Sequence, residues 1–173
     1  MDNLKAIIEG IVFLSETPIS VKKLREIIVD AEEQEILKVL HQLKQEYDER
    51  QSGLYVAEVA GGYQLRTRDT LGPWIKKFRG IKPVTLSQAA METLAVVAYR
   101  QPIMKAEIEK IRGVDVSGTL KGLLEKNLVR VVGRKDVPGR PIIYGTTKKF
   151  LEVFNLRDLS ELPTLRELKE LGD

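Results

Sequence analysis

The side chains that most often carry catalysis or bind metals are scarce in this sequence. Its 173 residues include a single histidine, His41, and no cysteine. The lack of cysteine excludes disulfides, thiol nucleophiles and zinc sites built on thiolates. His41 stands among Glu, Gln and Lys in a helical pattern, where a solvated or partly packed histidine is the ordinary interpretation. We therefore predict no catalytic residue, no metal ligand and no cofactor, and hence no enzyme.

Two further chemistries can be tested against the sequence. Residues 133–139 contain glycines, but neither the Walker A pattern nor a GxGxxG pattern occurs, so no nucleotide-phosphate loop is indicated. An enzyme using paired carboxylates would need two acidic groups with a raised pKa in one cleft. The acidic residues are spread over helical patterns, and no spacing indicates such a pair.

Charge is distributed unevenly along the chain. Residues 1–80 carry 12 basic and 13 acidic side chains, residues 81–155 carry 13 and 7, and residues 156–173 carry 3 and 5. Only the middle block has the bias expected of a nucleic-acid surface. Its basic side chains gather near one predicted hairpin, either as a solvated surface or as a weak contact for DNA or an acidic partner. They are Arg130, Arg134, Lys135, Arg140, Lys148 and Lys149.

The positive block belongs to the second of two related segments. Residues 17–27 align with residues 101–111 without a gap at an offset of 84, with proline and isoleucine positions coinciding. Such a long period indicates duplicated domains. We place these domains at residues 1–80 and 81–155, followed by a tail over residues 156–173.

Each copy has the pattern of three helices and a hairpin. In the first copy, apolar residues at 3.6-residue spacing predict helices over about 4–14, 20–28 and 32–47. Alternating segments around Gly61-Gly62 then predict a hairpin. The second copy repeats this order, with helices over about 87–99, 105–111 and 117–126 and strands over 129–132 and 142–144. The predicted fold is mainly α with small β-hairpins (α+β), arranged as tandem winged-helix domains. Residues 71–79 are expected to form a short connecting helix.

A winged helix that reads DNA usually places a basic third helix in the major groove. Here the segment 32–50 has a net charge of −3, and the segment 115–126 has a net charge of zero. A winged-helix DNA-binding transcriptional regulator therefore remains only the alternative hypothesis.

Several long motifs of the second copy resemble one known family. They are LSQAAMETLA at 86–95, AYRQPI at 98–103 and GRPIIYGTT at 139–147. Together with AEVAGGYQL at 57–65, they resemble the segregation and condensation protein B (ScpB) family over essentially the whole chain. The family usually has glycine where this chain has Asn155, and often threonine where it has Met104, which leaves the following helix without a good cap.

This resemblance implies a non-enzymatic subunit of a bacterial chromosome-condensing SMC complex. It implies a homodimer formed by the N-terminal domains, with C-terminal domains that bind the kleisin (protein A of the same system) and, through it, the SMC ATPase. The protein would then act in the cytoplasm at the nucleoid. No signal peptide is evident, and the apolar run 94–99 is far too short for a membrane span.

Candidate contact residues for the kleisin are signature positions of these motifs, and those for the dimer come from the first helix of copy one and the connecting helix. The dimer candidates could equally belong to the domain core. The tail carries leucine at every third residue from 156 to 171, which either packs on the second domain or meets another chain. For the kleisin the candidates are Tyr99, Arg100, Gln101, Arg140, Pro141 and Tyr144, and for the dimer Leu4, Ile8, Ile11 and Trp74.

Overall fold

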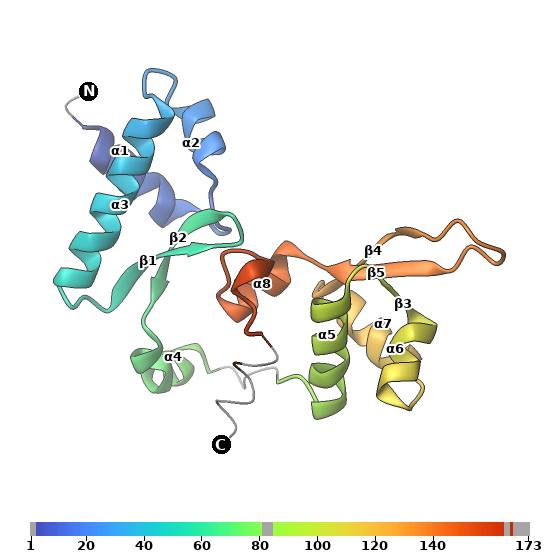
Figure 1. Ribbon diagram of the computed structural model, residues 1–173. Helices are drawn as coiled ribbons and strands as arrows, with labels where there is room; N and C mark the ends of the chain where they lie inside the picture. Colours follow the sequence, from blue (N-terminus) through green and yellow to red (C-terminus); the bar gives the residue numbers. More distant parts are fainter. Residues whose placement is uncertain (1–2, 81–84, 165–166, 168–173) are drawn as a thin grey trace. The chain divides into compact units, whose positions relative to one another are not determined.

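The computed structural model describes residues 3–80, 85–164 and 167 (Figure 1). The chain forms two compact units, one made of Met1–Pro83 with Asn155–Asp158 and the other of Val84–Phe154 with Leu159–Asp173. Both are mostly helical and carry a small antiparallel sheet, which confirms the predicted fold class.

The first unit begins with α1 (Leu4–Leu14), α2 (Val21–Ile27) and α3 (Glu33–Glu49). The hydroxyl of Ser20 accepts a hydrogen bond from the Lys23 backbone N–H at 3.2 Å, which caps α2. All three helices turn one apolar face inward, because their large aliphatic residues recur at helical spacing. The core includes Ile8, Val12, Leu24, Ile36, Leu40 and Leu43.

Two polar contacts tie α1 to α3 at the edge of this core. Lys5 pairs with Glu46, and this hydrogen bond lowers the pKa of the Glu46 carboxyl. The Tyr47 hydroxyl donates to a Glu9 carboxylate oxygen at 2.7 Å, which raises the pKa of Tyr47.

The hairpin of the first unit, called the first wing below, joins β1 (Leu54–Val59) to β2 (Gly62–Thr67). Its two-residue turn is Ala60-Gly61, with φ angles of 52° and 73°. Two successive positive φ angles match the right-handed twist of the strands. The prediction that Gly61-Gly62 form the turn was therefore wrong by one residue, since Gly62 already pairs with Val59 in the ladder.

Gly62 is needed for close packing instead of for the turn. A Cβ atom at this position would lie 2.8 Å from the backbone carbonyl of Ile19. The neighbouring Tyr63 exchanges two backbone hydrogen bonds of 2.9 Å with Ile19, so a single β-bridge joins the segment before α2 to the first wing.

A short helical segment follows the first wing, made of the 3-10 turn η1 (Asp69–Leu71) and α4 (Gly72–Arg79). This confirms the predicted connecting helix. Gly80 ends α4 with a φ angle of 60°, where glycine carries no Cβ penalty.

The helices of the second unit are α5 (Gln88–Arg100), α6 (Lys105–Arg112) and α7 (Ser117–Glu125). Met104, predicted to leave α6 without a good cap, donates its backbone N–H to a Glu107 carboxylate oxygen at 2.9 Å. This is the acidic half of a capping box and partly replaces a hydroxyl cap.

The sheet of the second unit has the order β3-β5-β4 and is antiparallel throughout. It contains β3 (Ile103–Met104), β4 (Val129–Arg134) and β5 (Ile142–Thr146). The sequence did not predict β3, because two residues are too few to show an alternating pattern. It also did not predict α8 (Lys148–Phe154), which is followed by the 3-10 turn η2 (Leu159–Glu161).

Residues 155–158 belong to the first unit. The backbone N–H groups of Ala60 and Gly61 donate to the carbonyls of Leu156 and Arg157 at 2.9 and 3.0 Å. Arg66 donates to the Asn155 side-chain oxygen at 3.0 Å. Asn155 has a φ of 55°, the left-handed conformation expected at a position where the family usually has glycine.

Candidate protein-interaction site

The centre of the candidate site is the junction between the end of α5 and strand β5. The side-chain oxygen of Gln101 accepts a hydrogen bond from the backbone N–H of Thr146 at 2.7 Å. The side-chain nitrogen of Gln101 donates to the Thr146 hydroxyl oxygen at 2.9 Å. Its amide also donates to the carbonyl of Ala98 at 3.1 Å, the last turn of α5. Gln101 therefore positions the end of this helix against the sheet and satisfies a buried backbone donor.

Gly145, in the motif GRPIIYGTT at 139–147, lies close to this junction. A Cβ atom there would lie 2.9 Å from the Gln101 side-chain oxygen and 3.0 Å from a methyl group of Val132. A side chain at residue 145 would therefore crowd the Gln101 oxygen that binds Thr146. The role of Gly145 is close approach and not a left-handed turn.

Tyr144 lies in the central strand of the sheet and is buried. It pairs with Ile103 on one side and with Val131 on the other. Its ring therefore supports the site from the core and offers little surface to a partner.

Tyr99 and two residues before it form an exposed row along α5. Met91, Ala95 and Tyr99 follow one another at intervals of four, which places them on one helical face. All three are exposed, Met91 by 43% and Tyr99 by 40%. We call this row the α5 stripe; the sequence identified only Tyr99, because burial of the remaining α5 faces could not be assigned beforehand.

The Tyr99 hydroxyl donates to the carbonyl of Pro163 at 2.6 Å. The described part of the tail therefore reaches the C-terminal end of α5. Leu165, Leu168 and Leu171 of the predicted leucine series lie outside the described residues.

Arg140 and Pro141 lie at a different place in the second unit. Arg140 has a φ of 40° and donates its backbone N–H to Val137 at 2.9 Å, and the Pro141 carbonyl accepts from Lys135 at 2.9 Å. Both residues thus close the turn between β4 and β5. Pro141 and Thr146 are five residues apart, about 17 Å along an extended strand. The structure joins Gln101 to β5, and Tyr99 and Arg100 are exposed just before it in the sequence, but Arg140 and Pro141 do not belong to this cluster.

The dimer candidates divide into buried and exposed residues. Ile8 is 0% exposed, and Leu4 and Ile11 pack against the same core. Trp74 on α4, in contrast, is 67% exposed. The sequence could not show that α1 ends in two more exposed apolar residues, Phe13 at 65% and Leu14 at 77%.

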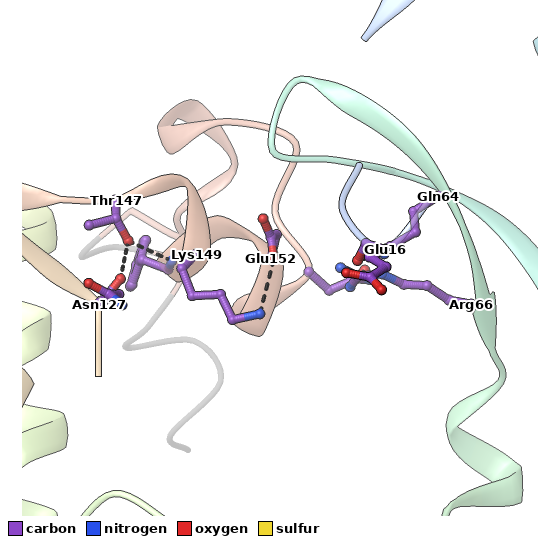
Figure 2. Close-up of polar contacts among 9 residues, drawn as sticks. Glu16, Gln64, Arg66, Asn127, Thr147, Lys149 and Glu152 are labelled. Atoms are coloured by element: carbon purple, nitrogen blue, oxygen red, sulfur yellow. Dashed lines mark hydrogen bonds and ion pairs between the residues drawn. The ribbon is translucent and has the colours of Figure 1, made fainter. Parts of the chain in front are cut away.

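The basic candidates also fall into two groups. Arg130, Arg134 and Lys135 lie on β4 and in the loop that follows it, and all are exposed. Lys148 and Lys149 begin α8, where Lys149 pairs with Glu152 at 3.1 Å, as Figure 2 shows.

Thr147 fixes the start of α8 beside these two lysines. Its hydroxyl donates to the carbonyl of Asn127 at 2.5 Å (Figure 2) and accepts from the backbone N–H of Phe150 at 3.1 Å. Thr147 thus caps the helix, and Lys148 and Lys149 occupy its first turn on the second unit's surface.

His41 is exposed on α3. Within residues 3–80, 85–164 and 167, no three His, Asp or Glu residues lie close enough together to hold a metal ion. No helix in this part of the chain is both long and apolar enough to cross a membrane.

Two helical units, each with an antiparallel hairpin and with apolar or basic side chains left on the surface, define a class of modular α+β proteins. The family model described as the segregation and condensation complex subunit ScpB matches residues 6–165. The protein belongs to this family, as its motifs predicted.

Similar proteins cover nearly the whole chain. The segregation and condensation protein B of Syntrophotalea carbinolica is 47% identical over 168 residues, which is 97% of this chain and 85% of that protein. The protein of the same name from Desulforamulus reducens is 41% identical over 172 residues, which is 99% of this chain and 94% of that protein.

Two solved structures resemble the chain more distantly. The structure of ScpB from Mycobacterium tuberculosis is 30% identical, with a TM-score of 0.42 and coverage of 88% of this chain and 95% of that one. A dimer of an ScpB N-terminal domain complexed with an ScpA peptide is 24% identical, with a TM-score of 0.39. The match covers 48% of this chain and 92% of that one.

Proposed function

We propose that this protein is a non-enzymatic accessory subunit of a bacterial SMC–kleisin complex. As a homodimer it clamps the kleisin subunit, and through the kleisin it acts on the SMC ATPase in chromosome condensation and segregation at the nucleoid. The observation that carries this proposal is the family match over residues 6–165. The names of the similar proteins give the same biological process.

We further propose that both units are winged helices that bind proteins. In each unit three helices precede an antiparallel hairpin, which is the order of a winged helix. The third helices do not suit base reading: α3 contains five acidic and two lysine side chains, and α7 contains one of each sign. An acidic helix repels phosphates, so no observation favours the transcriptional regulator.

The kleisin site we propose is the α5 stripe. An apolar row along one helix suits an amphipathic partner helix, which docks through side chains spaced three or four residues apart. The row ends beside Gln101, whose bonds to Thr146 hold the end of the helix in place. Tyr99, Arg100 and Gln101 remain kleisin candidates here, and Tyr144 is proposed to support the site from beneath.

For the dimer we propose the exposed end of α1 in place of its middle. Leu4, Ile8 and Ile11 already pack in the core of their own unit, whereas Phe13 and Leu14 expose most of their surface. Exposed large apolar side chains on a small unit are typical of contact surfaces. Trp74 stays a dimer candidate because it too is exposed.

The test is light scattering behind size exclusion, with the protein alone and with the central fragment of its cognate kleisin. We expect a free mass near two chains of 19.6 kDa and a heavier complex that co-elutes with the kleisin. Ala95→Glu on the α5 stripe should abolish co-elution, since a carboxylate replaces apolar contact. Ala89→Glu is the matched control, because residue 89 is exposed on another face of the same helix.

The dimer is tested in the same experiment. Leu14→Glu should give a mass near one chain, while Gln34→Glu, which adds the same charge on exposed surface of α3, should not. A dimer that does not co-elute with the kleisin fragment but forms a heavier complex with duplex DNA would refute the clamp and support the transcriptional regulator.

A further inference from the structure

The hairpin of the second unit is called the second wing; its residues 130–140 comprise most of β4 and the turn that leads to β5. Strand β3 pairs only with Ile143 and Tyr144. Toward the turn the sheet therefore has two strands only, and the side chains from residue 134 to residue 140 are all exposed. The second wing is a narrow two-stranded ribbon, drawn as the long hairpin of Figure 1.

Four of its side chains are cations, against the single carboxylate of Asp136. Within the described part of the chain, no carboxylate pairs with any of these four cations, although many other lysines and arginines have such partners. The four cations are Arg130, Arg134, Lys135 and Arg140.

Two of the arginines are held in place by neutral acceptors. The Arg130 side chain donates to the carbonyl of Thr146 at 3.2 Å, and the Arg134 side chain donates to the carbonyl of Arg140 at 3.2 Å. A carbonyl orients a guanidinium without neutralising its charge, and each guanidinium keeps further donors. The wing thus presents positioned positive charge for an anionic ligand.

The backbone of the second wing favours one of two kinds of anionic partner, an acidic peptide or duplex DNA. An acidic peptide could add a strand to the free edge of β4. However, the β4–β5 register shifts between Val131 and Gly133, and such a bulge breaks the regular row of edge donors and acceptors. A narrow ribbon with basic side chains along β4 and in the turn instead fits a groove of duplex DNA, whose phosphates line both of its sides.

We propose that the second wing binds the phosphate backbone of duplex DNA without sequence preference. Neither third helix carries a basic surface for reading bases, so the contact is electrostatic, with a Kd in the range of about 10⁻⁴–10⁻⁶ M at physiological salt. The wing then adds a direct DNA contact to the protein-binding role proposed above. This contact does not depend on kleisin binding.

The experiment measures the fluorescence anisotropy of a labelled duplex titrated with the full chain over a series of salt concentrations. The double variant Arg134→Gln/Lys135→Gln is compared with Lys22→Gln/Lys44→Gln, which removes the same charge from exposed positions of the first unit. We expect the wing variant to bind roughly tenfold more weakly and to lose about two from the slope of log affinity against log salt. The control variant should keep the slope of the unmodified protein.

Several outcomes would overturn the proposal. Equal losses in both variants would show that net charge, and not the wing, binds DNA. Much tighter binding to one of two unrelated duplexes would show base reading. Competition by poly-glutamate as effective as that by unlabelled duplex of equal charge would assign the wing to acidic proteins. Circular dichroism of both variants confirms that they are folded, which we expect because all four substituted side chains are exposed.

Discussion

The two wings have the same topology but opposite surroundings. The first wing has a two-residue turn, pairs with Ile19 through a single β-bridge and donates its turn N–H groups to the carbonyls of Leu156 and Arg157. The second wing has a longer turn, is exposed from residue 134 to residue 140 and carries four cations. The hairpin of the first unit is thus packed within its unit, whereas the turn of the second hairpin is exposed. The difference lies in what packs on each hairpin, because both hairpins are antiparallel ladders.

The largest expected effect comes from Gly62→Ala in the first wing. The new Cβ would meet the Ile19 backbone at 2.8 Å, and backbone cannot move aside as a side-chain end can. We expect a loss of about 3 kcal/mol in the free energy of unfolding, the upper end of the range for overpacking. Chemical denaturation followed by circular dichroism measures it.

Gly133→Ala in the second wing is the matched control. A Cβ there meets nothing within 4 Å, so we expect a change below about 0.5 kcal/mol. Equal effects of the two substitutions would contradict the contrast between a packed wing and a free one.

Next in size is Gln101→Ala, which removes the link between α5 and the base of the second wing. The Thr146 N–H is buried and would lose its acceptor. Leaving such a donor unpaired costs about 2 kcal/mol. The same denaturation experiment measures this loss. If Gln101→Ala is as stable as the unmodified protein, the junction does not hold the wing.

A smaller loss is expected from Gly139→Ala at the end of the second wing. Its φ of 84° lies in the left-handed region, where a Cβ costs about 1 kcal/mol even in open space. The comparison with Gly133→Ala isolates this backbone strain, because both positions are uncrowded. No difference between the two melting curves would mean that the turn relaxes freely.

The smallest effect concerns pH and involves the start of α7. Hydrogen bonding to Ser117 lowers the pKa of the Asp115 carboxyl below its ordinary value. A depressed pKa in the folded state contributes stability above the unfolded pKa, and this contribution is lost as pH falls through the folded value. When the pH is lowered from neutral to about 2, the melting temperature of Asp115→Asn should therefore fall by less than that of the unmodified protein. An unchanged acid profile would assign the loss of stability to other carboxylates.

The sequence by itself determined the helices and the family, and it predicted the duplication of one unit. Helical spacing and the repeated order of elements predicted α1, α3 and α5, and long motifs in the second unit identified the ScpB family. These signals are local, since helical periodicity, capping and turn chemistry act within a few residues. For the same reason, the prediction placed the first turn one residue too late. The sequence does not distinguish Gly61, which lies in the turn, from Gly62, which packs against the Ile19 backbone.

Only the tertiary structure decided which of these residues are available. Tyr144 lies in the central strand, Ile8 lies in the core, and Leu14 at the end of the same helix is exposed. Gly62 is required because Ile19, more than 40 residues earlier, passes against it. Residues 155–158 pack with the first unit although they follow the second in sequence. Burial depends on which distant segment covers a face, and a residue's own neighbours in sequence do not encode that.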